Sequence, residues 1–233
     1  MDAKSVKFEK IIGSLHAKFG RNQGAAIAHM KDDLPSDALL IAFFHVSEFL
    51  SKKKDCAAHE KLLAEYLKEI FADGVCVAYL AVSGLDTPAR VITRRILELG
   101  YVVLAYYDNP AKFWDWNSND KDISFSELEA FILSEGYISF LSKVSVVDSV
   151  RYCSVASTLR LAYAELSNVV HPKPYNFSIN FDGAFDFNGS NLSKVLHLQE
   201  TVCKGLLFLL FCRFPLAFAH VEKIDPKLQG RLM

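Results

Sequence analysis

Residues 155–174 read VASTLRLAYAELSNVVHPKP, and this stretch decides the fold because it sorts its residues onto two faces of one helix. One face is polar and includes Arg160, Ser167 and His171, which recur at helical spacing. A helix that serves only the core has no need of this second strip, so we expect the strip to carry function. The other face is an apolar stripe made of Leu159, Ala162, Tyr163, Leu166, Val169 and Val170.

His171 stands where this helix is expected to end. Pro172 and Pro174 follow it, and proline both lacks an amide proton and disfavours helical geometry in the residue before it. The exposed carbonyls of a helix C-terminus carry partial negative charge and favour an imidazolium, which suits a titrating group. A histidine that only caps the last carbonyls is the alternative, and both interpretations stay open.

The composition limits the classes of protein to consider. Hydrophobic residues make up 51% of the 233 residues and charged residues 23%, so either much surface is buried or an interface takes it up. We expect self-association. A formal net charge of −1 excludes a general nucleic-acid coat, so contact with RNA would require a local basic cluster.

The sequence contains no motif for a metal site, a nucleotide-binding loop or export from the cell. The five cysteines are scattered without metal-ligand spacing, as in reduced thiols of an intracellular protein, and no signal peptide opens the chain. We therefore expect a cytoplasmic protein. No Gly-rich phosphate loop, HExxH, GxSxG or acidic metal cluster occurs, so we expect no metal and no cofactor, and any catalysis would be acid–base chemistry.

The most apolar segment, residues 205–219 (GLLFLLFCRFPLAFA), is too short to cross a bilayer comfortably. As a helix it spans about 22 Å, against roughly 30 Å of hydrocarbon. It also contains Arg213 and Pro215. We expect a buried helix kinked at the proline and no membrane partner, with a membrane-surface or dimer-interface helix as the alternative.

The periodicity predicts an all-α protein, a helical bundle with one irregular, aromatic-rich insertion at about 173–191. We expect a single domain over 1–233, in which helices of residues 1–72 pack on a core of residues 74–221. The segment 109–122 holds both tryptophans and many turn formers, which predicts a loop. The expected helices cover residues 3–19, 25–30, 39–50, 57–82, 87–107, 124–133, 137–171 with a possible break near 147–148, and 192–221.

A run of arginines marks the helix that starts at Thr87. Arg90, Arg94 and Glu98 are four residues apart, so one Arg–Glu pair forms locally and another guanidinium is left over. Such a run is typical of a solvated, salt-bridged face; the alternative is an edge that binds phosphate through arginine's planar fork. Arg213 and His220 are separated by six residues, which we interpret as coincidence because Pro215 lies between them.

Two motifs carry a family resemblance. GLDTPARVITRRILE (84–98), a following long helix and YAELSNVVHP (163–172) resemble the bacterial HEPN-like helical proteins of phage defence and abortive infection, over residues 74–221. Active members of that clan are metal-independent endoribonucleases that dimerise and build their site from an arginine followed four to six residues later by a histidine. His171 matches the histidine, whereas Glu165 stands where the arginine is expected, and Arg160 lies about 16 Å along the helix.

The resemblance implies a homodimer that acts on RNA, with an arginine from the helix at Thr87 or from a second subunit. The chain either has such an arginine or keeps the scaffold without the nuclease step; in the latter case it would be a non-catalytic protein-binding subunit of a defence complex. A weaker alternative is a membrane-associated effector acting through residues 205–219. The residues expected to be catalytic are His171, Arg160 and Arg94, and those expected to bind substrate are Arg90, Arg95, Ser167, Asn168 and Tyr175, with Tyr175 either stacking on bases or pinning the insertion.

Overall fold

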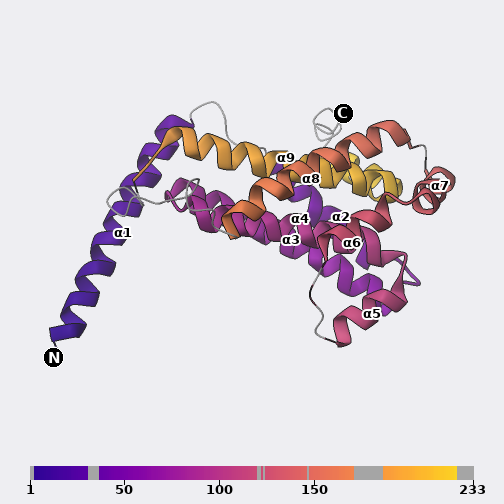
Figure 1. Cartoon of the computed structure of the whole chain (residues 1–233), viewed down its shortest axis with the longest axis horizontal. Helices are drawn as coiled ribbons and strands as arrows, with labels where there is room; N and C mark the ends of the chain where they lie inside the picture. The colour runs from indigo at the N-terminus through magenta and orange to yellow at the C-terminus, as the bar shows by residue number, and fades with distance from the viewer. Residues whose placement is uncertain are drawn as a thin grey trace.

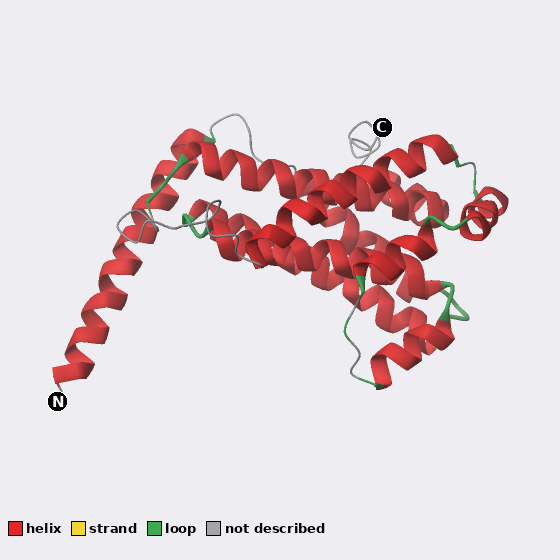
Figure 2. Cartoon of the chain, in the orientation of Figure 1, coloured by secondary structure: helices red, strands yellow, loops and turns green. Residues whose placement is uncertain are grey.

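Every regular element in the described part of the chain is a helix, as the sequence predicted (Figure 2). The computed structural model describes residues 3–30, 37–119, 122, 124–145, 147–170 and 186–224. Within these ranges there are ten helices. They are α1 (Ala3–His29), α2 (Asp37–Ser51), α3 (Ala58–Val82), α4 (Asp86–Tyr107), α5 (Pro110–Ser118), α6 (Phe125–Ile132), α7 (Glu135–Val144), α8 (Ser149–Val170), α9 (Gly189–Arg213) and α10 (Pro215–Ile224).

Helix α4 lies at the centre of the bundle. It packs against α3, α8 and α9, and its residues from Leu99 to Ala105 are all buried. The antiparallel neighbours α3 and α4 are joined by a tight turn in which Gly84 has a φ of 79°, a conformation that only glycine adopts at little cost. The N-terminal helices α2 and α3 also contact α9, and the expected division of the domain at residue 72 stays a prediction.

Glycines let α9 approach its neighbours closely. A Cβ at Gly100 would come within 2.5 Å of Leu206, and a Cβ at Gly205 within 2.6 Å of Leu159. Both glycines are therefore contact points, one between α4 and α9 and the other between α8 and α9. These contacts place α8 and α9 side by side across α4 (Figure 1).

Three boundaries differ from the expectation. Residues 110–118 form a helix instead of a loop, because the Asn109 side chain accepts a hydrogen bond from the Lys112 amide and Pro110 occupies the first turn. α1 continues through Gly20 and Gly24 as one helix. α9 already begins at Gly189, capped by Asn188, so the predicted insertion is helical at its end, and its residues 173–185 lie outside the described residues.

The apolar segment 205–219 belongs mainly to the interior. Leu206, Leu207, Leu209 and Leu210 are buried. The helix does not kink at Pro215 as expected: α9 ends before Phe214, and a separate helix, α10, begins after it. One helix in the described ranges, α9, is long and apolar enough to cross a membrane, and 61% of its most apolar stretch is buried in the protein. Core helices of soluble proteins have the same properties, so this is weak evidence for a membrane span.

Among the residues that the structure describes, only the C-terminal end of α1 docks on the bundle. Asn22 donates a hydrogen bond to the Ser83 carbonyl at 2.9 Å, Gln23 donates to the Ser83 hydroxyl at 2.9 Å, and Ala26 and Met30 are buried. From there α1 runs toward its N-terminus away from the other helices, as an arm (Figure 1).

Candidate functional site on helices α4 and α8

The structure describes six of the eight residues expected at the site. Arg90, Arg94 and Arg95 lie on α4, and Arg160, Ser167 and Asn168 lie on α8. The other two, His171 and Tyr175, lie outside the described residues.

Arg90 reaches across from α4 to Glu165 of α8, which lies on a different side of α8 from Arg160 and Ser167. Its Nη1 atom donates a hydrogen bond to Glu165 Oε1 at 3.0 Å. The Arg90 side chain is 14% exposed and the Glu165 side chain 55%, so the arginine is held against the protein while the glutamate faces solvent. The position where the resemblance leads one to expect an arginine is thus occupied by a glutamate that binds an arginine from the neighbouring helix.

Arg94 also contacts α8, one helical turn further along α4. Its Nε donates to Glu98 Oε1 at 2.9 Å, and its Nη2 donates to the Tyr163 hydroxyl at 2.8 Å. The Arg94 guanidinium carbon lies 4.8 Å from the centre of the Tyr163 ring, a cation–π distance. Tyr163 stacks in parallel on Phe125 of α6 with ring centres 3.8 Å apart, so Arg94 rests on a rigid aromatic pair.

Arg95 does not join this site. It points toward α3, where it forms ion pairs with Glu69 and Asp73. Burial raises the pKa of Asp73 above its usual value, although the charge of Arg95 acts in the opposite direction. Arg95 therefore ties α4 to α3, on a different side from Arg90 and Arg94.

The remaining α8 residues have separate surroundings. Arg160 is exposed and lies near Glu129 of α6; burial raises the pKa of Glu129, and the charge of Arg160 opposes that shift. The Ser167 hydroxyl and Glu129 Oε1 are buried without a hydrogen-bond partner among the described residues. Asn168 is half-buried. Arg90 and Arg94 of α4 thus both contact α8, whereas Arg160 lies near Glu129 of α6.

Carboxylates neutralise the guanidinium groups of this face. Glu165 and Glu98 pair with Arg90 and Arg94, and Asp86 in the first turn of α4 also lies within electrostatic range of Arg90. Burial raises the pKa of Asp86, and a hydrogen bond with Asn191 and the charge of Arg90 limit the rise. An anion that binds here has to compete with these carboxylates for the arginines. Across the described ranges no three His, Cys, Asp or Glu side chains group so that they could hold a metal ion.

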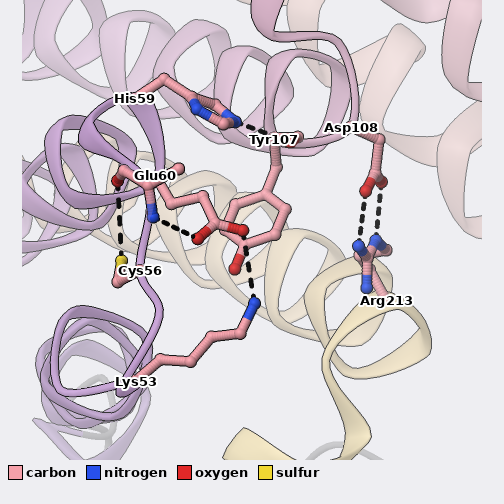
Figure 3. Close-up of polar contacts among 8 residues, drawn as sticks. Lys53, Cys56, His59, Glu60, Tyr107, Asp108 and Arg213 are labelled. Carbon is pink, nitrogen blue, oxygen red and sulfur yellow. Dashed lines mark hydrogen bonds and ion pairs between the residues drawn. The ribbon is translucent and has the colours of Figure 1, made fainter.

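A second polar cluster, which the sequence did not suggest, joins the start of α3 to the ends of α4 and α9 (Figure 3). Glu60 accepts a hydrogen bond from the Ala57 amide at 2.9 Å and also contacts Lys53 and the Tyr107 hydroxyl. Burial alone would raise the pKa of Glu60, but these three partners together hold it below its usual value. His59 Nε2 lies 3.2 Å from the Tyr107 carbonyl oxygen.

Arg213 completes this cluster at the end of α9. Its Nε and Nη2 atoms donate to the two carboxylate oxygens of Asp108 at 2.6 and 2.5 Å (Figure 3). Its guanidinium also lies 5.3 Å from the centre of the Tyr107 ring and 4.8 Å from that of Phe214. With one edge paired to both oxygens of Asp108 and its face against aromatic rings, Arg213 acts as a clamp between helix ends. It lies on a different helix from His220, so the spacing of six residues between them is not a shared site.

No sequence signal could have paired Asp108 with Arg213, which are 105 residues apart. Glu60, by contrast, stands at the third position of a helix, where a glutamate commonly accepts a hydrogen bond from the amide before the helix.

In comparisons with known proteins, no family model matches the chain, and neither a curated protein nor a solved structure matches it.

Proposed function

We propose that this chain is a HEPN-like, metal-independent endoribonuclease of a bacterial antiphage defence or toxin system, cytoplasmic and active as a homodimer. The single observation that supports the proposal is the hydrogen bond between Arg90 and Glu165, because it places a guanidinium from α4 on α8 six residues before His171 in the sequence. Val170, the residue before His171, is about 7.5 Å along α8 from Glu165. Arg90 thus supplies the arginine that α8 itself lacks at this point.

The proposed reaction needs one group that moves protons and one that stabilises charge. The RNA 2′-hydroxyl oxygen attacks the neighbouring phosphorus and the bond to the 5′-oxygen breaks, which leaves a 2′,3′-cyclic phosphate and a 5′-hydroxyl. His171 takes the proton from the 2′-hydroxyl or gives one to the leaving oxygen, since imidazole titrates near neutral pH. Arg90 stabilises the additional negative charge on the phosphate oxygens.

Glu165 then has a defined role: it holds Arg90 until a phosphate replaces it. The Glu165 side chain is 55% exposed, and pairs of this kind contribute only about 0.2–1 kcal/mol, so displacement of the carboxylate costs little. Arg94 is held more firmly by Glu98 and Tyr163 and keeps α4 and α8 in register beside the site.

The experiment is cleavage of total RNA by purified protein in EDTA, with four variants. His171→Ala removes the proton-transfer group and Arg90→Met removes the charge, and we expect each to lower the rate by about 100-fold or more. Glu165→Gln removes the carboxylate charge that competes with phosphate for Arg90, so the rate of cleavage should stay the same or rise. Arg95→Met is the matched control, because it removes the next-but-one arginine of α4, which faces α3, and we expect it to leave cleavage unchanged.

Absence of cleavage in EDTA, or cleavage that does not respond to His171→Ala, would contradict the nuclease proposal. Cleavage that responds equally to Arg90→Met and Arg95→Met would show that neither arginine acts through the site.

A second candidate function is that of a non-catalytic protein-binding subunit of a defence complex. It is favoured by exposed apolar side chains on the paired helices α2 and α3, where Ile41 and Phe44 are 39% and 38% exposed and Val75 and Tyr79 are 50% and 62% exposed. Light scattering after size exclusion tests it. A complex or a dimer that Phe44→Ser and Tyr79→Ser disrupt supports a binding surface there, and a monomer without co-purifying protein argues against it.

A further inference from the structure

The N-terminal part of α1 exposes an apolar stripe that continues a buried one. At the docked end of the helix, Ala26 and Met30 are buried against the bundle. Toward the N-terminus, at helical spacing on the same side, Phe8, Ile11 and Ile12 are 66%, 56% and 49% exposed. Single exposed apolar residues are common, but three on one stripe of a projecting helix form a surface that is ready to be covered.

Positive charge accompanies this stripe. The whole chain has 26 basic and 27 acidic residues, of which α1 holds five basic residues and a single acidic one, Glu9. At about 100° per residue, Lys10, Lys18 and Arg21 fall within an arc of about 80° beside the apolar stripe. Lys18 pairs with Asp186 at 2.7 Å, near the docked end. The arm is thus basic, and the rest of the chain is acidic.

The apolar stripe and the positive charge together indicate what kind of partner binds the arm. A second α1 packed antiparallel on the stripe would bring the basic flanks of both helices together, which is unfavourable. A helix with an apolar stripe, basic flanks and modest overall hydrophobicity instead suits the interface of an anionic membrane. The stripe enters the boundary between headgroups and acyl chains, while lysine and arginine stay at the level of the lipid phosphates.

We propose that the N-terminal part of α1 binds the surface of membranes that contain anionic phospholipids. The arm suits this role because it leaves the bundle, so it can lie flat on a bilayer while the acidic bundle stays away from the surface (Figure 1). This contact differs from a membrane span through α9, and it does not depend on the nuclease activity.

The experiment is co-sedimentation of the full-length protein with vesicles of phosphatidylcholine alone or with about 30% phosphatidylglycerol. We expect binding to the anionic vesicles, weaker binding to the neutral ones, and a decrease as salt screens the charges. Ile11→Ser with Ile12→Ser should lower the partition coefficient by about 30-fold or more, because two apolar side chains are lost from the interface. Ile27→Ser is the matched control, since Ile27 is 66% exposed on the same helix but lies off the stripe.

Two opposite charge reversals separate membrane binding from a fault in folding. Lys10→Glu should weaken binding to anionic vesicles and Glu9→Lys should strengthen it, each by about 30-fold at low salt, because each changes the charge by two. Circular dichroism checks that the helix content is kept.

Three results would overturn the proposal. The first is no binding of the wild-type protein to anionic vesicles. The second is an equal loss of binding in the Ile27 control. The third is concentration-dependent self-association that the Ile11 and Ile12 substitutions abolish, which would assign the stripe to a second copy of the chain.

Discussion

Substitution of Arg213 by methionine tests whether this residue is a structural clamp. The guanidinium donates two hydrogen bonds to Asp108 at 2.6 and 2.5 Å, and the two side chains are only 16% and 18% exposed. Methionine keeps much of the apolar contact with Tyr107 and Phe214 but leaves the Asp108 carboxylate without its cation.

The expected cost follows from these contacts. Breaking a fully buried ion pair by removing one partner costs about 3–5 kcal/mol, mainly because the other charge stays buried and unpaired. Solvent screens this pair partly, and cation–π contacts of about 0.5–1 kcal/mol are lost as well. We therefore expect Arg213→Met to lower the free energy of unfolding by about 2–4 kcal/mol and Tm by about 5–15 °C in a chain of this size.

Urea denaturation followed by circular dichroism measures this change, with m-values compared to check that the unfolding transition is the same. The double variant Arg213→Met with Asp108→Leu should recover more than half of the lost stability, because no unpaired charge is left. Well below its unfolding temperature, Arg213→Met should cleave RNA as the wild type does. A loss of stability under about 1 kcal/mol, or a loss of cleavage without a loss of stability, would refute the clamp.

Two further substitutions test packing and electrostatics. Gly205→Ala should destabilise the protein by about 1–2 kcal/mol in urea denaturation, because the new methyl group would meet Leu159. Gly136→Ala is the control and should be neutral or stabilising, because no atom lies within 4 Å of its new methyl group. Equal effects of the two substitutions on stability would contradict the close contact at Gly205. Glu60→Gln should cost about 1–2 kcal/mol at pH 7. Because the folded state lowers the pKa of Glu60, its contribution is complete above the unfolded pKa of about 4.3 and is lost as the pH falls from there through the lower pKa of the folded state. A stability difference between wild type and Glu60→Gln that stays constant from pH 7 to pH 3 would contradict this assignment.

The sequence predicted the helices wherever apolar residues recur at helical spacing over several turns. The bounds expected for α4, 87–107, differ from the structure by one residue, and the expected break before α8 falls between Val144 and Ser149. The loop predicted at 109–122 was wrong for residues 110–118, because the many turn-forming residues there were given more weight than a local helix-start signal. Asn109 followed by Pro110 is a capping residue followed by the residue favoured at a first helical position, and this pair starts α5.

The contacts of the site could be predicted only in part. The strip on α8 is visible in the sequence, and so is the surplus of arginines on α4, because both are local patterns. Which arginine reaches α8 depends on the rotation of α4, and this is set by buried packing that no local pattern reveals. Arg90 and Glu165 are 75 residues apart, and Arg94 and Tyr163 are 69 apart. Arg95, next to Arg94 in the sequence, faces α3 because successive residues of a helix point about 100° apart.

The energies of these contacts bear on how the proposed site on α4 and α8 would become active. The pair of Arg90 and Glu165 is partly exposed and worth at most about 1 kcal/mol, so it would slow phosphate binding without preventing it. If an RNA phosphate replaces the Glu165 carboxylate, however, the net gain in affinity is small, because the Arg90 guanidinium binds one anion in either case. RNA binding therefore needs additional positive charge at the same place, which the imidazolium of His171 or a second subunit would supply. On this argument, cleavage should rise more steeply than linearly with protein concentration in the range where the dimer forms, and a rate per chain that is independent of concentration would place the whole site within one subunit.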